Sequence, residues 1–212
     1  MNKISLQSYL RPLPLIAVLR GITPAEIDAV GAALIDNGFR ILEVPLNSPA
    51  PFDSIARLER RFGEHCLTGA GTVIKVTDVA KVAAAGGKLI VMPHGDVEIV
   101  REAKRLGMLC VPGVATPTEA FAALDAGADG LKMFPAEQLS PAALKAWRAV
   151  LPKGALVFPV GGIRPDNMTP YWEVGADGFG TGSNLYTPGA TADTVREAAV
   201  RYAAGFASLN AR

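Results

Sequence analysis

Short apolar runs alternate with longer segments of helical periodicity along the whole chain. The runs are rich in Val, Ile and Leu and end at Gly, Pro or polar residues, which is typical of buried β-strands. The segments between them often open on Pro or Asp and close on Gly, which is typical of α-helices. Predicted strands cover residues 13–19, 41–46, 67–73, 89–93, 109–114, 130–135, 156–163 and 178–182. Predicted helices begin at Pro24, Pro51, Thr77, Asp96, Pro117, Pro141, Pro165 and Thr191.

The glycines that close these helices recur at intervals of roughly 20 to 27 residues, about the length of one βα unit. Eight such units predict an α/β fold, a (β/α)8 TIM barrel in which residues 1–212 form a single domain. A short N-terminal helix is expected to cover the barrel floor through Leu6 and Leu10. An open, doubly wound sheet is the alternative. No G-x-G-x-x-G follows the first run, so a dinucleotide site has no local support.

Composition narrows the classes of function. The chain has 212 residues, half of them hydrophobic, and a formal net charge of +1. Lys and Arg do not cluster in blocks, which argues against binding to nucleic acid or to a membrane surface. The apolar run at 13–19 is too short to span a bilayer, and no signal-peptide cleavage site follows it. We therefore expect a cytoplasmic protein, with Cys66 and Cys110 buried.

Lys132 is the strongest candidate for chemistry, because it lies inside the sixth apolar run, Gly-Leu-Lys-Met-Phe-Pro. Side chains alternate along a strand, so Lys132 points away from the side that Leu131 and Met133 share. If those two pack against helices, the amine points into the barrel, where burial lowers its pKa and makes it nucleophilic. Such an amine forms Schiff bases with ketones. The structural alternative is a lysine that snorkels to solvent or pairs with a carboxylate.

Glu43 lies in another apolar run, Ile-Leu-Glu-Val-Pro. A carboxylate there is costly unless it is paired or functional. Close to Lys132 it is expected to transfer protons, with its pKa raised by the same apolar walls. A structural Lys–Glu ion pair is the alternative, and the two roles are compatible.

Glycines and polar residues gather at the ends of the last two runs. Gly161, Gly162, Gly182 and Ser183 follow the seventh and eighth runs, where barrels often bind phosphate. Glycines let backbone amides approach an anion closely. We therefore expect a phosphate cradle here, with tight turns that bind no ligand as the alternative.

Other run ends carry further candidates for binding. Arg20 ends the first run, and its guanidinium suits a carboxylate, to which Thr72 would add a hydroxyl donor. A surface salt bridge is the alternative for Arg20. Pro93 ends the fourth run and is expected to line the substrate site, whereas no role is assigned to His94. With only His65 as the other histidine, a zinc site is not expected.

Several stretches in register resemble the pyruvate-dependent class I aldolases of the 2-keto-3-deoxy-6-phosphogluconate (KDPG) group. They are Leu-Glu-Val-Pro-Leu at 42–46, Gly-Ala-Gly-Thr-Val at 69–73, Pro-Gly-Val-Ala-Thr-Pro-Thr-Glu at 112–119, Leu-Lys-Met-Phe-Pro-Ala at 131–136 and Pro-Val-Gly-Gly-Ile at 159–163. The resemblance implies that Lys132 forms the Schiff base, that Glu43 moves protons, and that the predicted cradle holds the substrate phosphate. It also implies a homotrimer without metal or cofactor.

Two positions depart from the gluconate type of this family. That type has an arginine where this chain has Asn47, and a threonine where this chain has Val160. This chain has its arginine at position 20 instead, and these features resemble the branch that acts on 2-dehydro-3-deoxy-6-phosphogalactonate, the C4 epimer. The resemblance implies reversible cleavage of this phosphorylated ketoacid to pyruvate and D-glyceraldehyde 3-phosphate, with Val160 affecting the choice of epimer. The alternatives are the gluconate epimer as substrate, a phosphosugar isomerase or epimerase on the same barrel, and a phosphosugar-binding barrel without turnover.

Overall fold

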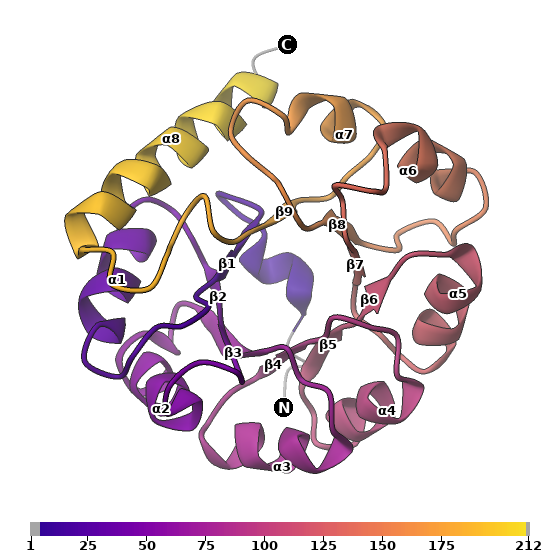
Figure 1. The fold of residues 1–212 in the computed structure, drawn as a ribbon. Coiled ribbons are helices and arrows are strands. Elements are labelled where there is room, and N and C mark those ends of the chain that lie inside the picture. The colour runs from indigo at the N-terminus through magenta and orange to yellow at the C-terminus, as the bar shows by residue number, and fades with distance from the viewer. Residues whose placement is uncertain (1–4, 211–212) are drawn as a thin grey trace.

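The structure, a computed structural model, describes residues 5–210. Parallel strands lie at the centre, and helices surround them on the outside (Figure 1). The strands are β1 (Leu15–Val18), β2 (Ile41–Pro45), β3 (Leu67–Gly71), β4 (Leu89–Val91), β5 (Leu109–Val111), β6 (Gly113–Val114), β7 (Leu131–Met133), β8 (Val157–Pro159) and β9 (Phe179–Thr181). The helices are the 3-10 helix η1 (Leu6–Tyr9) and the α-helices α1 (Ile27–Ile35), α2 (Pro51–Phe62), α3 (Val76–Ala84), α4 (Val97–Arg105), α5 (Pro117–Asp125), α6 (Pro141–Arg148), α7 (Thr169–Glu173) and α8 (Ala192–Asn210).

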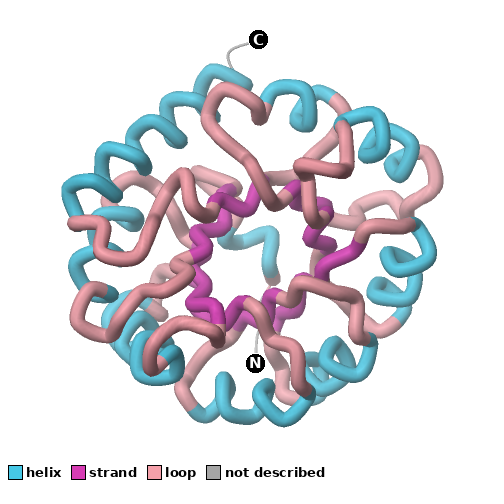
Figure 2. Tube along the Cα trace, viewed as in Figure 1, coloured by secondary structure: helices cyan, strands magenta, loops and turns pink. Residues whose placement is uncertain are grey.

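The hydrogen-bond ladders divide the strands into two curved parallel sheets. The order is β5-β4-β3-β2-β1-β9 in the six-stranded sheet and β6-β7-β8 in the three-stranded sheet. The sheets are linked at both edges, because Asp129 N, just before β7, donates to Cys110 O of β5 across 2.9 Å and Val160 forms an isolated parallel bridge with Gly180. The strands thus lie in a ring inside the helices (Figure 2). The predicted α/β fold with a parallel sheet is confirmed.

Each predicted apolar run contains a strand, but the run at 109–114 was wrongly expected to be continuous. It divides into β5 and β6 at Pro112, and this break separates the two sheets. Proline has no amide hydrogen to donate to a ladder, so regular pairing cannot continue through it. The Pro112 carbonyl still accepts from Lys132 N in the β6–β7 ladder, and Asp129 N donates to Cys110 O, which keeps β5 beside the start of β7.

The helix starts follow the predicted signals, with two shifts. The helix expected from Pro24 begins at Ile27, because residues 24–26 form a turn. Pro51, Pro117 and Pro141 each lie in the first turn of their helices, as predicted. The helix expected from Pro165 begins only at Thr169. Residues 164–167 form a turn instead, because Arg164 N donates to Asn167 Oδ1 across 2.8 Å. Asn side chains compete for backbone donors in this way and so delay the start of a helix.

Apolar side chains fill the ring at the amino ends of the strands. This inner cluster includes Ile16, Ile41, Leu89 and Phe158, and Leu6 of η1 joins it with 2% exposure. η1 therefore lies across the centre of the ring, as the indigo helix in Figure 1 shows. The predicted contact of the N-terminal helix with the barrel floor is confirmed. A second, larger cluster lies between the strands and the outer helices and contains both buried cysteines.

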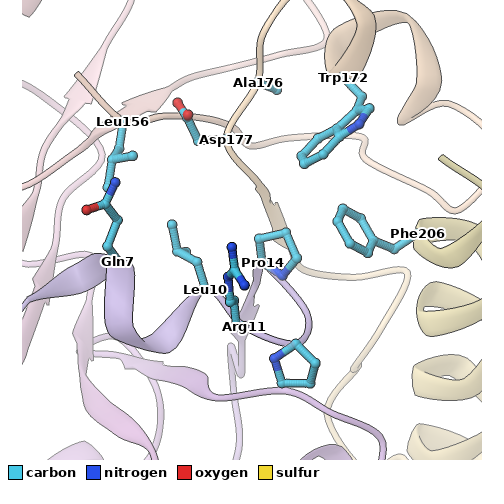
Figure 3. Close-up of a pocket in the computed structure, with 10 residues that line it drawn as sticks. Gln7, Leu10, Arg11, Pro14, Leu156, Trp172, Ala176, Asp177 and Phe206 are labelled. Atoms are coloured by element: carbon cyan, nitrogen blue, oxygen red, sulfur yellow. The ribbon is translucent and has the colours of Figure 1, made fainter. Parts of the chain in front are cut away.

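A cavity of about 950 Å³ opens beside this floor. It is lined by residues that precede strands, such as Pro14, Leu156 and Asp177, together with Trp172 and Phe206 (Figure 3). None of the predicted functional residues lines it. Function in barrels gathers at the opposite, carboxyl ends of the strands. Among the helices formed by residues 5–210, none is long and apolar enough to cross a membrane.

Candidate active site

Lys132 occupies the middle of β7 and points into the ring. Its neighbours in the chain, Leu131 and Met133, are fully buried in the cluster between strands and helices. Because side chains alternate along a strand, Lys132 faces the opposite way, and its residue is 6% exposed. The ring of Phe134, two residues further on the same face, lies 4.5 Å from the Lys132 Nζ. The predicted inward orientation of Lys132 is confirmed.

The surroundings of Lys132 favour its neutral form. Burial lowers the pKa of the Lys132 amine, because the ammonium loses its hydration inside the protein. The nearby Arg20 guanidinium acts in the same direction, whereas the Glu43 carboxylate opposes it. An amine with a lowered pKa is more often neutral near pH 7, and only the neutral form is a nucleophile.

Glu43 lies in β2 and is 1% exposed. Burial raises the pKa of its carboxyl group to about 7, although Lys132 and Arg20 favour its charged form. Glu43 Oε2 is buried without a hydrogen-bond partner among the described residues. Such an orphaned acceptor is costly for folding and typical of a functional site. A carboxyl group with this pKa can both give and take a proton near neutral pH.

Gly71, at the end of β3, makes room for this carboxylate. Gly71 pairs with Pro45 in the neighbouring strand, and a Cβ at position 71 would overlap Glu43 Oε2. Any side chain there would displace the Glu43 carboxylate or the strand. The glycine is therefore required by the space that Glu43 occupies.

Arg20 is held in place by two other loops. Its Nη1 donates to Asn47 Oδ1 across 2.7 Å, and its Nη2 donates to Thr72 Oγ1 across 3.2 Å. Gly21 N donates to Ser48 Oγ across 2.9 Å, which adds a second link between the loop after β1 and the loop after β2. The predicted proximity of Arg20 and Thr72 is confirmed, and the expected alternative, a surface salt bridge, is not found for Arg20 among the described residues.

A cavity of about 400 Å³ extends from Arg20 and Lys132 to the loops after β8 and β9. Within residues 5–210, the backbone amides of Gly162, Gly182 and Ser183 donate to no backbone carbonyl. Free amide donors beside glycines are suited to binding an anion such as phosphate. The cavity is lined by Val18, Arg20, Lys132, Phe134, Glu137, Val160, Gly161, Gly162, Ile163, Gly180, Gly182, Ser183, Asn184, Tyr186, Thr187 and Pro188.

Not every predicted residue reaches this cavity. Glu43 is buried and does not line the cavity, although its carboxyl group is close enough to Lys132 to feel its charge. Thr72 does not line the cavity either, but it accepts a hydrogen bond from Arg20, which does. Pro93 does not line it and instead lies against Gly113, where a Cβ would be 2.5 Å from the Pro93 carbonyl carbon. His94 is exposed.

Four residues of the site carry no predicted role from the sequence: Asn47, Gly71, Phe134 and Glu137. The sequence could have indicated Phe134, because it lies two positions after Lys132 and therefore points to the same side of the extended chain. The other three come together with their partners only in the folded chain.

The arrangement suits nucleophilic chemistry on a ketone that carries two anionic groups. The amine supplies the nucleophile, the carboxyl group with a pKa of about 7 supplies proton transfer, and Arg20 and the free amides supply anion binding. Among the described residues, no group of three or more His, Cys, Asp or Glu side chains is placed to hold a metal ion.

Comparison with known proteins identifies relatives over almost the whole chain. A probable 2-dehydro-3-deoxy-6-phosphogalactonate aldolase of Rhizobium meliloti (strain 1021) is 45% identical over 206 residues, which cover 97% of this chain and 96% of the relative. The 2-dehydro-3-deoxy-6-phosphogalactonate aldolase of Escherichia coli (strain K12) is 45% identical over 190 residues, which cover 90% of this chain and 93% of the relative. The resemblance inferred from the sequence motifs is confirmed.

A solved structure and a family profile agree with these relatives. The structure described as "Native KDPGal structure" superimposes with a TM-score of 0.93 at 43% identity, covering 95% of this chain and 98% of that chain. The profile described as "Aldolase: KDPG and KHG aldolase" matches residues 6–198. The chain is therefore a carbon–carbon lyase that belongs to the KDPG and KHG aldolase family.

Proposed function

We propose that this aldolase cleaves 2-dehydro-3-deoxy-6-phosphogalactonate reversibly to pyruvate and D-glyceraldehyde 3-phosphate, through a Schiff base on Lys132. The observation that carries the proposal is the burial of the Lys132 amine next to the Glu43 carboxyl group, in a ring whose cavity is also lined by Arg20 and by free backbone amides. Two relatives that are 45% identical carry the name of this activity. No metal or cofactor takes part in the proposed reaction.

The first half of the reaction forms a covalent intermediate. The neutral amine of Lys132 attacks the C2 ketone of the substrate, and Glu43 protonates the departing oxygen, directly or through water. Loss of water leaves an iminium ion, whose cationic nitrogen withdraws electrons from the adjacent carbons. The pKa of Glu43, about 7, leaves both protonation states of the carboxyl group populated near neutral pH.

The second half breaks the carbon–carbon bond. The ionised Glu43 takes the proton of the C4 hydroxyl, the C3–C4 bond breaks, and its electron pair moves towards the iminium nitrogen to form an enamine. The aldehyde product, D-glyceraldehyde 3-phosphate, then leaves. Glu43 returns its proton to C3 of the enamine, and hydrolysis of the iminium releases pyruvate and restores the free amine of Lys132.

Binding groups align the substrate with the amine. Arg20 and Thr72 bind the ketoacid carboxylate, which fixes the C2 ketone within reach of Lys132. Gly161, Gly162, Gly182 and Ser183 bind the phosphate at the other anionic end of the substrate.

The galactonate epimer is favoured over the gluconate epimer by Val160. Val160 lines the cavity in β-bridge contact with Gly180 and offers no hydrogen bond to a hydroxyl group. A threonine here, as in the gluconate type, would offer a hydrogen bond to the C4 hydroxyl of the gluconate epimer. Valine offers none, so the gluconate epimer loses a polar partner and the galactonate epimer is favoured. The gluconate epimer and a phosphosugar isomerase or epimerase activity are the alternatives.

The proposal extends to the assembly of the protein. We propose that the two sheets act as one closed (β/α)8 barrel in a single domain. The supporting observations are the hydrogen bond from Asp129 N to Cys110 O, the bridge between Val160 and Gly180, and the inner cluster that both sheets share. We also propose a cytoplasmic homotrimer that binds neither nucleic acid nor membranes.

Trapping the intermediate tests the mechanism. Borohydride added with pyruvate should reduce the Schiff base and leave a stable pyruvyl adduct on the peptide that contains Lys132, detected by mass spectrometry. Lys132→Met should abolish the adduct, and Lys145→Met, which removes an exposed lysine of α6, should preserve it. An unmodified Lys132 peptide in the wild-type protein would exclude the mechanism.

Comparing substrates tests the reaction itself. Release of pyruvate from the galactonate and gluconate epimers, followed with lactate dehydrogenase, should be faster for the galactonate epimer. Absence of pyruvate, with interconversion of a phosphosugar instead, would favour the isomerase alternative.

A further inference from the structure

Glu137 is an acidic residue in a cavity that otherwise attracts anions. It follows β7 in the loop to α6 and lines the same cavity as Lys132, Arg20 and the glycines at 161 and 162. The other residues of the lining with ionisable side chains of this kind are basic, namely Arg20 and Lys132. The proposed phosphate cradle therefore has a carboxylate in its wall. Arg20 and Lys132 supply the cationic side chains of the cavity lining.

The Glu137 side chain lies directly against the two glycines. A Cβ built on Gly161 would overlap Glu137 Oε2, and a Cβ built on Gly162 would lie 2.8 Å from Glu137 Cγ. Both glycines have positive φ angles, 109° and 63°, which other residues rarely adopt. The position of Glu137 is thus a second reason why neither residue can carry a side chain.

Glu137 is not bound into the loop that it touches. Its carboxylate accepts no hydrogen bond from the described part of the chain, although the amide of Gly162 is free. A carboxylate that organised this loop would accept charge-assisted hydrogen bonds from such amides. Glu137 is exposed, so its charge is in contact with solvent.

We propose that Glu137 weakens the binding of the phosphate group, and so speeds the release of the phosphorylated aldehyde. The inference rests on the proposed function, because it uses the cradle at the glycines. A phosphate monoester carries a charge of roughly −1.5 to −2 at neutral pH. At about 6–8 Å, an exposed carboxylate repels it, at the dielectric of bulk water, by an amount that changes affinity about three- to tenfold.

Titration with inorganic phosphate tests this role. Glu137→Gln keeps the shape of the side chain and removes its charge, and Glu173→Gln makes the same change at an exposed residue that ends α7 and does not line the cavity. The dissociation constant for phosphate, measured by calorimetry at low salt, should fall about three- to tenfold in Glu137→Gln and stay unchanged in Glu173→Gln. Borohydride trapping of pyruvate should be unaffected in both variants.

The sign of the effect separates this role from a structural one. If Glu137 only supported the loop, its replacement would raise the dissociation constant for phosphate, and an unchanged or raised value would overturn the inference. If wild-type protein binds no phosphate but traps pyruvate, the cradle and this inference both fall and the Schiff-base mechanism stands. If phosphate binding tightens in Glu137→Gln but pyruvate is never trapped, the inference stands and the Schiff-base mechanism falls.

Discussion

Arg20 Nη1 donates a 2.7 Å hydrogen bond to Asn47 Oδ1, which joins the loop after β1 to the loop after β2. Asn47 occupies the position where the gluconate type of the family has an arginine. In this chain the cation comes from the loop after β1, and the residue at position 47 orients it. A guanidinium that Asn47 and Thr72 hold in place before a carboxylate binds loses less conformational entropy on binding.

Removing this support should weaken substrate binding more than turnover. In Asn47→Ala we expect the KM for the ketoacid to rise about five- to thirtyfold, since a hydrogen bond to a charged group contributes about 1–2 kcal/mol at a partly exposed site. The kcat should change much less. Steady-state kinetics on Asn47→Ala and on Asn47→Asp, which retains an acceptor for Arg20, measure this difference. Equal KM values in wild type and Asn47→Ala would show that Arg20 needs no such support.

Replacing Glu43 should separate binding from chemistry. Glu43→Gln keeps the size of the side chain but cannot transfer protons, so kcat should fall about 10²- to 10⁴-fold. The carboxylate of pyruvate should still bind, because Arg20 and Thr72 are unchanged. Single-turnover rates and pyruvate binding measure the two effects. An unchanged kcat would clear Glu43 of its proposed role.

The raised pKa of Glu43 also makes stability depend on pH. Its carboxyl group binds a proton more tightly in the folded protein, with a pKa of about 7, than at its ordinary value of 4.5 in the unfolded chain. Ionisation therefore opposes folding, and the free energy of unfolding should decrease as pH rises through this window.

Comparison with Glu43→Gln isolates this contribution. The loss of stability between about pH 5 and about pH 8 should be about 2–3 kcal/mol larger in the wild type than in Glu43→Gln. Urea unfolding at both pH values measures it. Parallel pH profiles for the two proteins would mean that the group titrates normally.

Gly71 should tolerate no side chain. Gly71→Ala places a methyl group on the Glu43 carboxylate, and we expect at least about 10²-fold loss of kcat, comparable to misplacing a catalytic group by about 1 Å. Gly95→Ala is a matched control, since a Cβ there would lie no closer than 3.4 Å to any neighbour, and it should remain active. Full activity of Gly71→Ala would show that Glu43 has room to move.

Val160 should affect the choice between epimers. Val160→Thr conserves volume and adds a hydroxyl group to the cavity wall, so the ratio of kcat/KM for galactonate over gluconate should fall by about one order of magnitude. Parallel assays of the two epimers on wild type and variant measure this ratio. An unaltered ratio would place epimer selection elsewhere in the cavity.

Periodicity alone predicted most of the secondary structure, because local signals suffice for it. Apolar runs located each strand, and prolines located the starts of α2, α5 and α6. The division at Pro112 was missed because one residue interrupted an otherwise regular apolar run. The delayed start of α7 was missed because the hydrogen bond that Arg164 N donates to the Asn167 side chain outcompeted the helix.

The chemistry of the site was also readable in part. An isolated lysine and an isolated glutamate in apolar runs stand out, because charged groups are rarely buried without a function. Lys132 and Glu43 were found for that reason. Pro93 was expected to line the cavity and does not, since position at a strand end says nothing about how far a loop reaches.

The sequence by itself thus determined the alternation of strands and helices. It also determined that an amine and a carboxyl group lie on buried strands. Both features depend on neighbours within a few positions of the chain. Tertiary structure alone decided that Asn47 holds Arg20, that Gly71 admits Glu43 and that Glu137 lies on Gly161. Each of these contacts joins residues from different βα units. Their distances depend on how the ring curves and closes, which no local pattern encodes.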